Sequence, residues 1–340
     1  MTIIRKLSTW GERLPVPDFV SRLAIASLVR STDRALVADK GNTEIFARDM
    51  ADFPIAVHAD AANRQHYEVP GQFFAQILGF QLKYSCCYYN NSADTLTIAE
   101  QNALKLTAGY ANISDGQRIL ELGCGWGSLS LWLAERFPKA QITAVSNSNS
   151  QRLFIEQEAR CRGISNLKVV TADINNFSPA ETFDRVVSVE MFEHIANWRA
   201  LLGRIRAWLK PDGRLFIHVF AHRQHCYRFD AADTSDWIAQ HFFTGGLMPS
   251  ATLVHQFPDL FTVEAEWRWS GEHYRATAED WLANFDRNLV QIDPILRAIY
   301  GADAPLWRRR WRLFFLATSG LFGHAGGEAW RVHHYRLRAA

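Results

Sequence analysis

The hydrophobic positions change their period along the chain, and from residue 118 onward they alternate between a strand-like and a helix-like period. Short apolar runs predict five strands, in "RILELG" (118–123), "QITAVS" (141–146), "LKVVTAD" (167–173), "FDRVVSVE" (183–190) and "RLFIHVFA" (214–221). Amphipathic stretches between them predict helices, in "SLSLWLAERFP" (128–138), "QRLFIEQEARCRG" (151–163) and "RALLGRIRAWLKPDG" (199–213). Because strands and helices take turns, the pattern favours a parallel, doubly wound α/β sheet.

Both ends of the chain depart from this alternation. "DFVSRLAIASLVRS" (18–31) has a helical apolar stripe at Phe19, Leu23, Ala26 and Leu28, and "PGQFFAQILGF" (70–80) predicts a short helix. Residues 222–260 are expected to form an insertion or lid. A sixth strand in "LFTVEAEWRWS" (260–270), helices over 276–323 and a closing strand in "EAWRVHHYRLR" (328–338) follow. We therefore expect an N-terminal helical region (1–80) and an α/β domain (81–340) with insertions at about 222–260 and 276–323.

Composition and charge narrow the classes of function. The 340 residues are 48% hydrophobic and 21% charged, which is typical of a globular protein with a large core. A net charge of +2 is too small to indicate a nucleic-acid partner, so we expect none. The five cysteines form no CxxC pair, which suits a reducing compartment. With neither a membrane-spanning run nor a signal peptide in the pattern, the sequence predicts a cytoplasmic protein.

A glycine-rich turn separates the first predicted strand from its helix. "ILELGCGWGSLSLWLA" (119–134) contains Gly123, Gly125 and Gly127, a spacing that lets the backbone turn tightly beside a ligand. It is neither the GxGxxG of dinucleotide sites nor a P-loop. With Glu121 in front, E-x-G-x-G-x-G resembles motif I of class I S-adenosylmethionine-dependent methyltransferases, where the methionine and ribose of the cofactor lie over the glycines. The alternative is a turn used for close strand–helix packing.

The next two strand ends supply further candidate cofactor ligands. "TAVSNSNSQ" (143–151) has Ser146, Asn147 and Gln151 where most class I enzymes carry an acid for the ribose hydroxyls. Hydroxyl and amide groups can still hydrogen-bond a diol. In "TADI" (171–174) the resemblance places Asp173 near the adenine amino group, with Ile174 beside it. The alternative for Asp173 is capping of its own loop.

The fourth strand turns abruptly polar in "VVSVEMFEHIANW" (186–198). Glu190, Glu193 and His194 follow the apolar run directly. Ligands of an open α/β sheet bind beyond the carboxyl ends of its strands, so these groups are expected on the same rim as the glycines. If a helical turn begins at Glu190, all three share one face and place a base beside the reactive methyl. Capping of a helix N-terminus is the alternative for the acids, and a structural histidine is the alternative for His194.

Five segments together resemble one enzyme superfamily. They are "YSCCYYN" (84–90), "ELGCGWGSLS" (121–130), "VSVEMFEHIANW" (187–198), "FFTGGLMPSA" (242–251) and "SGEHYRATAEDWL" (270–282). The superfamily contains the cyclopropane-fatty-acyl-phospholipid synthases and coclaurine N-methyltransferase. The resemblance spans roughly residues 65–338 and implies a class I methyltransferase: a Rossmann-like, doubly wound, mostly parallel seven-stranded sheet with N-terminal helices and a helical lid. "EMFEH" and "FFTGGLMPSA" are closer to the coclaurine N-methyltransferase branch, whereas the lipid synthases usually have glycine at the position of Glu190.

The resemblance also assigns roles to single residues. In the synthases a bicarbonate ion serves as base, held by a cysteine, a glutamate, a histidine and a tyrosine. The matching positions are Cys86, Glu193, His218 and Tyr274. The plant amine methyltransferase lacks equivalents of His218 and Tyr274 and relies on its EMFEH segment. The residues expected at the cofactor S-adenosyl-L-methionine are Tyr84, Ser85, Glu121, Gly123, Gly125, Trp126, Gly127, Ser146, Asn147, Gln151, Asp173 and Ile174.

Two enzyme hypotheses follow. The first is an N-methyltransferase for a small cyclic amine, in which Glu190 and Glu193 act as base and cation anchor and His194 assists. A secondary amine of pKa ~10 is protonated at pH 7, and removing that proton costs about 4 kcal/mol. A carboxylate placed to accept the proton can offset this cost. The alternative is methyl or methylene transfer to the double bond of an unsaturated phospholipid acyl chain, with bound bicarbonate as base.

Further expectations concern the surroundings of the site. One or two aromatic residues should line the acceptor pocket, out of Phe242, Phe243, Trp267, Trp269, Tyr274 and Trp281. The segment "WRRRWR" (307–312) is either a solvated helix face or a peripheral membrane contact. No metal is expected, because the His222–His225–Cys226 group lacks a second spaced pair. A homodimer is a further expectation.

Overall fold

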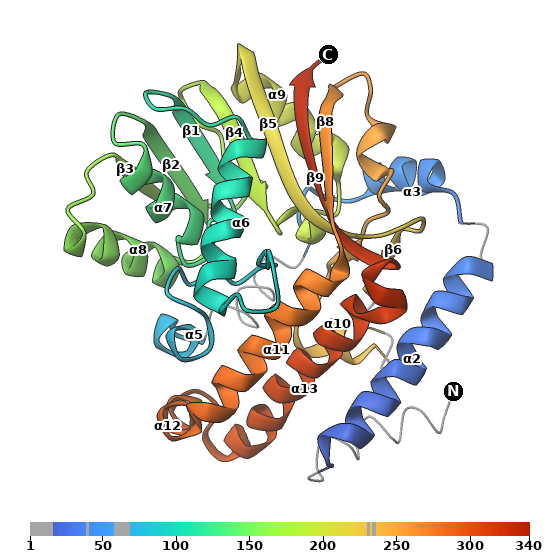
Figure 1. Ribbon diagram of the computed structural model, residues 1–340. Coiled ribbons are helices and arrows are strands. Elements are labelled where there is room, and N and C mark those ends of the chain that lie inside the picture. Colours follow the sequence, from blue (N-terminus) through green and yellow to red (C-terminus); the bar gives the residue numbers. More distant parts are fainter. Residues whose placement is uncertain (1–15, 39–40, 58–68, 230–231, 233–235) are drawn as a thin grey trace.

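A seven-stranded sheet forms the centre of the molecule (Figure 1). The computed structural model describes residues 16–38, 41–57, 69–229, 232 and 236–340. The strand order is β3-β2-β1-β4-β5-β9-β8; β1 to β5 are parallel, and β9 is antiparallel to both β5 and β8. The strands are β1 (Arg118–Leu122), β2 (Gln141–Ser146), β3 (Leu167–Thr171), β4 (Phe183–Val189), β5 (Leu209–His222), β8 (Phe261–Trp269) and β9 (Trp330–Ala339). The predicted mostly parallel seven-stranded sheet is thereby confirmed.

Helices cover both faces of this sheet, as a doubly wound fold requires. On one face pack α6 (Leu96–Tyr110), α7 (Ser128–Arg136) and α8 (Asn149–Cys161); on the other packs α9 (Trp198–Trp208). Within β1 the side chain of Ile119 joins the core under α6 and α7, whereas Leu120 joins the core under α9. This alternation buries both faces of the strand, and it explains the near-continuous apolar runs of the sequence.

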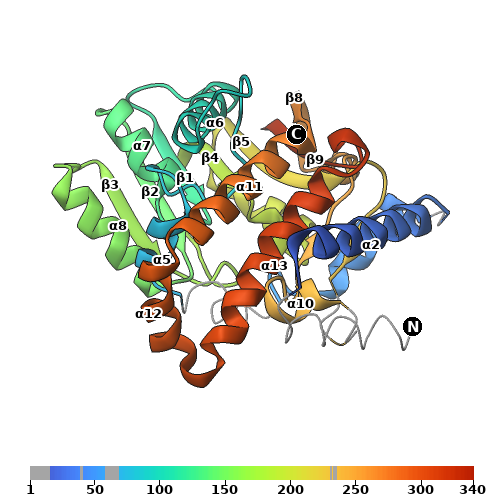
Figure 2. The same cartoon turned by 60° about the horizontal axis from the view of Figure 1, so that its bottom comes forward.

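A separate layer of helices lies across the carboxyl ends of the parallel strands (Figure 2). Its members are α5 (Gly71–Ile77), α11 (Gly271–Arg287), α12 (Leu289–Tyr300) and α13 (Ala304–Phe322). The helices α11 and α13 lie side by side, and a buried cluster rich in aromatic side chains, including Phe73, Trp281, Trp311 and Phe315, holds the layer together. The helices predicted for 276–323 are present, and the first of them already begins at Gly271.

The predicted N-terminal helix is confirmed as α2 (Asp18–Ala38), but its apolar stripe is not the face that packs against the rest of the protein. Ile25 and Val29 are buried against the rest of the protein, while Asp18 and Arg22, on the same face, form ion pairs with Arg312 (2.8 Å) and Glu279 (2.6 Å). The packed face of α2 therefore carries charged as well as apolar residues. A search by hydrophobicity alone picks out the adjacent, exposed face of the helix instead. The exposed residues of the predicted stripe are Phe19, Leu23, Ala26 and Leu28.

The remaining short elements close the sides of the fold. Near the N-terminus these are α3 (Thr43–Asp49) and η1 (Met50–Asp52); within 222–260 they are β6 (Tyr227–Arg228), α10 (Trp237–His241), β7 (Leu247–Met248) and η3 (Leu253–Gln256). Much of the 222–260 segment is packed rather than loose, because Phe242, Leu247 and Leu253 are fully buried. The domain boundary at residue 80 stays a prediction.

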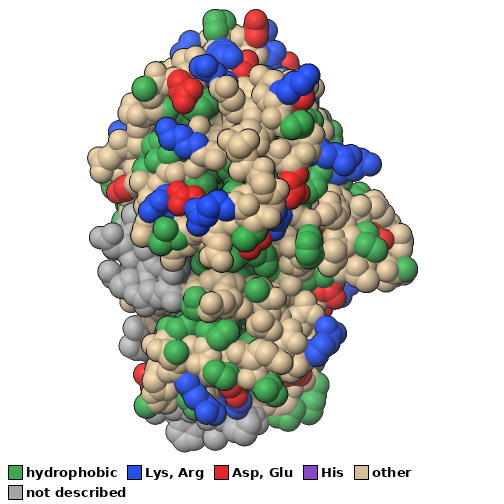
Figure 3. Space-filling model, turned by 90° about the vertical axis from the view of Figure 1, so that its left-hand side faces the viewer, with side chains coloured by type: hydrophobic (Ala, Val, Ile, Leu, Met, Phe, Trp, Pro, Cys, Tyr) green, Lys and Arg blue, Asp and Glu red, His purple; other side chains and the backbone are tan. Residues whose placement is uncertain are grey.

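The surface carries both signs of charge. On the face seen in Figure 3, Lys and Arg side chains are interspersed with Asp and Glu side chains, and neither sign dominates among the described residues there. Within the described part of the chain, no helix combines the length and the hydrophobicity that a bilayer crossing would need.

Candidate active site

Two adjoining cavities lie where β1, β2, β3 and β4 end. We call them the Asp173 cavity and the Glu190 cavity. Both are lined by the glycine turn and by the segment after β4; the residues they share are Gly123, Gly125, Gln151, Met191 and His194. This is the rim at which open parallel sheets bind their ligands.

The three glycines of the turn serve different purposes. Gly123 has φ +78°, and a Cβ atom there would lie 2.7 Å from Cγ of Met191. Gly127, the N-cap of α7, has φ +83°, and its Cβ would lie 2.7 Å from Cγ1 of Ile155. A Cβ at Gly125 would meet no described atom within 4 Å, although its φ of +52° also favours glycine. The outer two glycines thus allow close packing, and the middle one leaves backbone exposed to both cavities.

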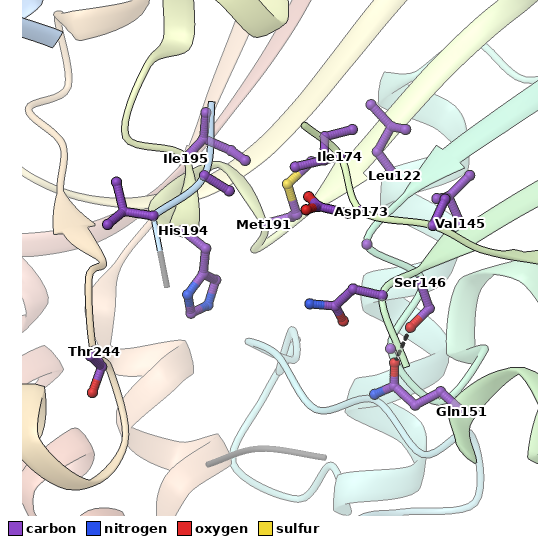
Figure 4. Close-up of a pocket in the computed structure, with 16 residues that line it drawn as sticks. Leu122, Val145, Ser146, Gln151, Asp173, Ile174, Met191, His194, Ile195 and Thr244 are labelled. Atoms are coloured by element: carbon purple, nitrogen blue, oxygen red, sulfur yellow. Dashed lines mark hydrogen bonds between the residues drawn. The ribbon is translucent and has the colours of Figure 1, made fainter. Parts of the chain in front are cut away.

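The Asp173 cavity gathers the polar residues predicted at the ends of β2 and β3 (Figure 4). Ser146 Oγ donates to Oε1 of Gln151 at 2.6 Å, on the side of the cavity opposite His194. Oδ1 of Asp173 accepts from the backbone N–H (2.8 Å) and side-chain amide (3.0 Å) of Asn175. Asp173 therefore caps its loop and lines the cavity at the same time. Asn147 and Ile174 belong to the same lining.

Glu190 lies at the centre of a hydrogen-bond cluster drawn from distant parts of the chain. Its Oε1 accepts from the backbone N–H of Cys86 at 2.8 Å and lies 3.2 Å from Nε2 of His218. Its Oε2 accepts from the hydroxyl of Tyr274 at 2.6 Å. An ionised carboxylate can only accept, so the neutral His218 ring donates from Nε2. Three residues that the resemblance assigned to bicarbonate thus converge on the Glu190 carboxylate.

No helical turn begins at Glu190, so the condition for the three side chains to share one face is not met. Glu190 has φ +48°, which is left-handed, and a single 3-10 turn begins two residues later at Phe192. As a result, Glu190, Glu193 and His194 do not share one face. The carboxyl group of Glu193 is fully buried outside the linings of both cavities, and its Oε1 accepts from the backbone N–H of Phe220 at 2.7 Å. The His194 ring lines both cavities and lies 4.4 Å from the ring of Phe243.

Burial and neighbouring charges shift the pKa values of Glu190 and Glu193 by different amounts. Burial raises the pKa of Glu190, but the charge of Lys83 and the hydrogen bonds from Tyr274 and Cys86 act in the opposite direction. Burial and the charge of Glu190 raise the pKa of Glu193 well above its usual range. On balance the pKa of both carboxyl groups is raised, and that of Glu193 is raised further, which favours Glu190 as the member of the pair that carries the negative charge. Burial keeps the pKa of His218 well below its usual range and that of Tyr274 well above, so both are neutral.

Lys83 lines the Glu190 cavity, and the sequence analysis did not single it out. It is 3% exposed, and its Nζ donates to Oγ of Ser85 (2.5 Å) and to the carbonyl oxygen of Cys86 (2.6 Å). The Cys86 thiol donates to the Cys87 carbonyl oxygen, and burial raises its pKa well above the usual range. Cys86 therefore contributes its backbone N–H rather than a thiolate. A single lysine in a sequence gives no signal that it is buried.

Aromatic and polar side chains complete the Glu190 cavity. Of the six candidate aromatic residues, Phe243, Tyr274 and Trp281 line it, and the structure adds Phe220 and Phe314. Phe242 packs in the core, Trp267 stacks on Tyr110, and Trp269 contacts His334. The cofactor candidates Tyr84, Ser85, Glu121 and Trp126 are also in the lining. Glu121 is buried, accepts from Ser130 Oγ, and burial raises its pKa to about 7.

The residues present fit S-adenosylmethionine but not bicarbonate. The Asp173 cavity combines apolar Val145 and Ile174 with polar Asp173, which suits an adenosine moiety, and Gly125 exposes backbone between the cavities. Bicarbonate would need donors that already bind Glu190, and it would lie against that negative charge. Within the described residues, no group of three or more His, Cys, Asp or Glu side chains is placed to hold a metal ion.

The fold and these cavities define a class I methyltransferase that uses S-adenosylmethionine. The chain belongs to the family described as mycolic acid cyclopropane synthetase, whose profile matches residues 57–325. It is 39% identical to (S)-coclaurine N-methyltransferase of Thalictrum flavum subsp. glaucum over 285 aligned residues. The alignment covers 82% of this chain and 79% of that protein. The crystal structure of coclaurine N-methyltransferase bound to N-methylheliamine and SAH superposes with a TM-score of 0.93, at 32% identity over 99% of this chain and 100% of the other.

A lipid synthase is a more distant relative. Cyclopropane-fatty-acyl-phospholipid synthase of Escherichia coli K12 is 28% identical over 271 residues, covering 79% of this chain and 66% of that protein. The comparisons confirm the superfamily and the fold class that the sequence motifs predict, and with them the S-adenosylmethionine-dependent activity.

Proposed function

We propose that this chain transfers the methyl group of S-adenosylmethionine to the nitrogen of a small cyclic amine, with Glu190 as the base. The observation that carries the proposal is the Glu190 carboxylate itself. It lines the cavity that adjoins the glycine turn, and the charge of Lys83 and the hydrogen bonds from Tyr274 and Cys86 favour its ionised form. The pKa of its neighbour Glu193 is raised further, so Glu193 is the less favourable place for the negative charge. The 39% identity to an N-methyltransferase and the structural match support the same acceptor class.

The reaction needs a proton acceptor before the new bond can form. A protonated secondary amine has no lone pair, and its deprotonation at pH 7 costs about 4 kcal/mol. In the proposed reaction the ammonium proton passes to the Glu190 carboxylate, and the freed lone pair forms the N–C bond while the C–S bond breaks toward sulfur. Bound S-adenosylmethionine supplies a methyl group that is already activated by its sulfonium charge. Holding the two reactants in line can lower the barrier by roughly 7–11 kcal/mol.

The neighbouring residues have supporting roles in this proposal. Aromatic rings of Phe243, Tyr274 and Trp281 surround the acceptor space, and ring faces favour a cation before it loses its proton. His194 lies on the cavity wall beside Phe243, where it can orient the amine. Glu193 is a positioning residue, because its carboxyl group binds the β5 backbone at Phe220 outside the acceptor space.

Transfer to the double bond of an unsaturated lipid is the second candidate, and the E. coli synthase relative favours it. It would require a bicarbonate base, for which the donors around Glu190 are already used. In the "WRRRWR" segment, Arg312 forms ion pairs with Asp18 and Asp286, and Arg308 forms one with Asp293. Two of the positive charges of this segment are therefore paired within the protein. Peripheral membrane contact, a cytoplasmic location and a homodimer remain predictions.

Labelled methyl transfer decides between the two acceptors. The protein is incubated with S-adenosylmethionine labelled in its methyl group, in parallel with a panel of cyclic secondary amines and with vesicles of unsaturated phospholipid. We expect label on the nitrogen of an amine product, identified by mass spectrometry. Label on the acyl chains, as an added methylene, would replace our proposal by the lipid alternative. Two variants, Glu121→Gln and Glu190→Gln, are assayed beside the wild type. They distinguish loss of cofactor binding from loss of the base.

A further inference from the structure

A buried carboxylate on α6 binds the turn that leads to Lys83. Glu100 is fully buried, and it accepts hydrogen bonds from three backbone N–H groups: Oε1 from those of Gly79 (2.9 Å) and Lys83 (3.1 Å), and Oε2 from that of Gln81 (2.8 Å). Converging N–H groups of this kind favour a negative charge. Burial raises the pKa of Glu100, while these three bonds and the charge of Lys83 act in the opposite direction.

The turn 79–83 depends on these bonds for its shape. Leu82 has φ +52°, a left-handed conformation that is unfavourable for leucine. Gly79 lies directly against Glu100, since a Cβ atom there would be 2.5 Å from Oε2 of the carboxylate. The bonds to Glu100 therefore offset the strain at Leu82, and they fix the direction in which the chain leaves the turn at Lys83.

Lys83 connects this turn to Glu190. Its Nζ donates to Oγ of Ser85 and to the carbonyl oxygen of Cys86, and the backbone N–H of Cys86 donates to Oε1 of Glu190. Both acceptors of the Lys83 ammonium group are neutral. Its charge acts on the carboxyl groups of Glu100 and Glu190, and it favours the ionised form of each.

We propose that Glu100 is a positioning residue for Glu190. It fixes the turn 79–83, and the turn holds the ammonium group of Lys83 at the Glu190 cavity. The consequence for catalysis rests on the proposed function, in which Glu190 is the base. The sign of the effect distinguishes this role from a direct one. A second negative charge nearby would raise the pKa of Glu190, whereas a residue that holds Lys83 in place lowers it.

The first test measures the pKa of Glu190 in the cofactor-free protein. Glutamate labelled with carbon-13 at its side-chain carboxyl carbon is incorporated, and the Glu190 signal is the one missing from the NMR spectrum of Glu190→Gln. Glu100→Gln should raise this pKa by about one pH unit or more, because the turn loses acceptors for its N–H groups and Lys83 is displaced. A pKa of Glu190 that falls or stays unchanged would overturn the proposal. The other titratable groups that face Glu190 are left intact in this variant; they are Cys86, Glu193, His218 and Tyr274.

Two further variants control for misfolding and for the loss of charge. Gly79→Ala keeps the carboxylate but places a methyl group against it, so it should displace the turn and also raise the pKa of Glu190. If Glu100→Gln does not fold, Gly79→Ala takes its place in the test with the same two outcomes. Asn102→Ala removes a hydrogen bond from α6 to the carbonyl oxygen of Tyr88, further along the same segment, and should lower Tm without moving the pKa of Glu190. An equal rise in Asn102→Ala would indicate a general effect of packing and would overturn the role of Glu100.

The second test follows the acidic limb of the kcat/KM profile, with the acceptor that the labelling experiment identifies. The limb should move toward higher pH in Glu100→Gln, and Lys83→Met should move it in the same direction. In the Lys83→Met background Glu100→Gln should add no further shift, because the charge that it positions is gone; a second shift of the same size would overturn the proposal. The NMR titration needs neither cofactor nor acceptor. A raised pKa of Glu190 with an unmoved profile would therefore disprove Glu190 as the base and leave the role of Glu100 intact.

Discussion

The Tyr274 hydroxyl donates a hydrogen bond of 2.6 Å to Oε2 of Glu190, a residue 84 positions earlier in the chain. Tyr274 belongs to the first turn of α11, in the helical layer, and Glu190 follows β4 of the sheet. Both side chains line the same cavity. One hydrogen bond thus joins the layer that covers the site to the group proposed to do its chemistry, and it stabilises the ionised form of that group.

Tyr274→Phe should therefore weaken the base without removing it. The lost hydrogen bond raises the pKa of Glu190, so the base becomes available only at higher pH. We expect turnover at pH 7 to fall about 10- to 150-fold, since a hydrogen bond to a charged group contributes about 1.5–3 kcal/mol. The acidic limb of the kcat/KM profile should move toward higher pH. An unshifted profile would show that Tyr274 does not act on the base.

The chain offers a matched control in Tyr89. Its hydroxyl donates to Oδ2 of Asp280 at 2.8 Å, so Tyr89→Phe removes a bond of the same kind outside both cavities. We expect a comparable loss of thermal stability and an unchanged pH profile of kcat/KM. A profile that moves equally in both variants would point to a general effect on the helical layer.

Glu190→Gln and Glu193→Gln should have unequal effects, although the residues are three positions apart. Glu190 is the proposed base, so its amide should lower turnover by about 10²–10⁴ and leave cofactor affinity nearly unchanged. Glu193 holds a proton, and a glutamine oxygen can still accept from the Phe220 N–H, so we expect a loss of about tenfold at most. Single-turnover rates and calorimetric cofactor titration measure both quantities. The reverse order would move the base from Glu190 to Glu193.

Glu121 should make the cofactor-free protein less stable as pH rises. Burial raises its folded pKa from 4.5 to about 7, so the folded state holds a proton that the unfolded state has lost between these values. Stability tied to that proton is complete below about pH 4.5 and is lost by about pH 7, with an upper limit near 3 kcal/mol. Glu121→Gln should match the wild type near pH 5 and exceed it near pH 8 in urea unfolding. The exposed Glu135→Gln, on α7, is the control and should show no such divergence.

The cavity lining proposed to bind the cofactor was predictable because its signals are local. A strand, a glycine turn and a helix follow one another within a short stretch, and the ends of parallel strands must meet at one rim. Gly123, Gly125, Ser146 and Asp173 therefore reach the cavities as predicted from their places in the chain.

The proposed catalytic half of the site depends on long-range contacts and on one backbone angle. The left-handed conformation of Glu190 turns Glu193 away from the acceptor space, and a run of residue letters does not reveal that angle. In the sequence, Lys83 cannot be told from a surface lysine. Its burial is possible because oxygen atoms of Ser85 and Cys86 accept hydrogen bonds from its Nζ. Likewise α2 buries Ile25 rather than Leu23, because its partner helices supply an arginine and a glutamate for the charges on that face.

Gly125→Ala should weaken cofactor binding while largely preserving the fold. The new methyl group meets no described protein atom within 4 Å and projects where both cavities meet, so we expect at least a tenfold rise in the Kd for S-adenosylmethionine by calorimetry. The positive φ adds a stability cost of about 1 kcal/mol.

Gly116→Ala is the matched control, because Gly116 also has positive φ and open space but lies on an exposed turn. This variant should lose similar stability and bind the cofactor normally. Gly123→Ala, whose methyl would collide with Met191, should instead lower Tm most. If Gly125→Ala and Gly116→Ala bind the cofactor equally well, the cofactor does not lie across this turn.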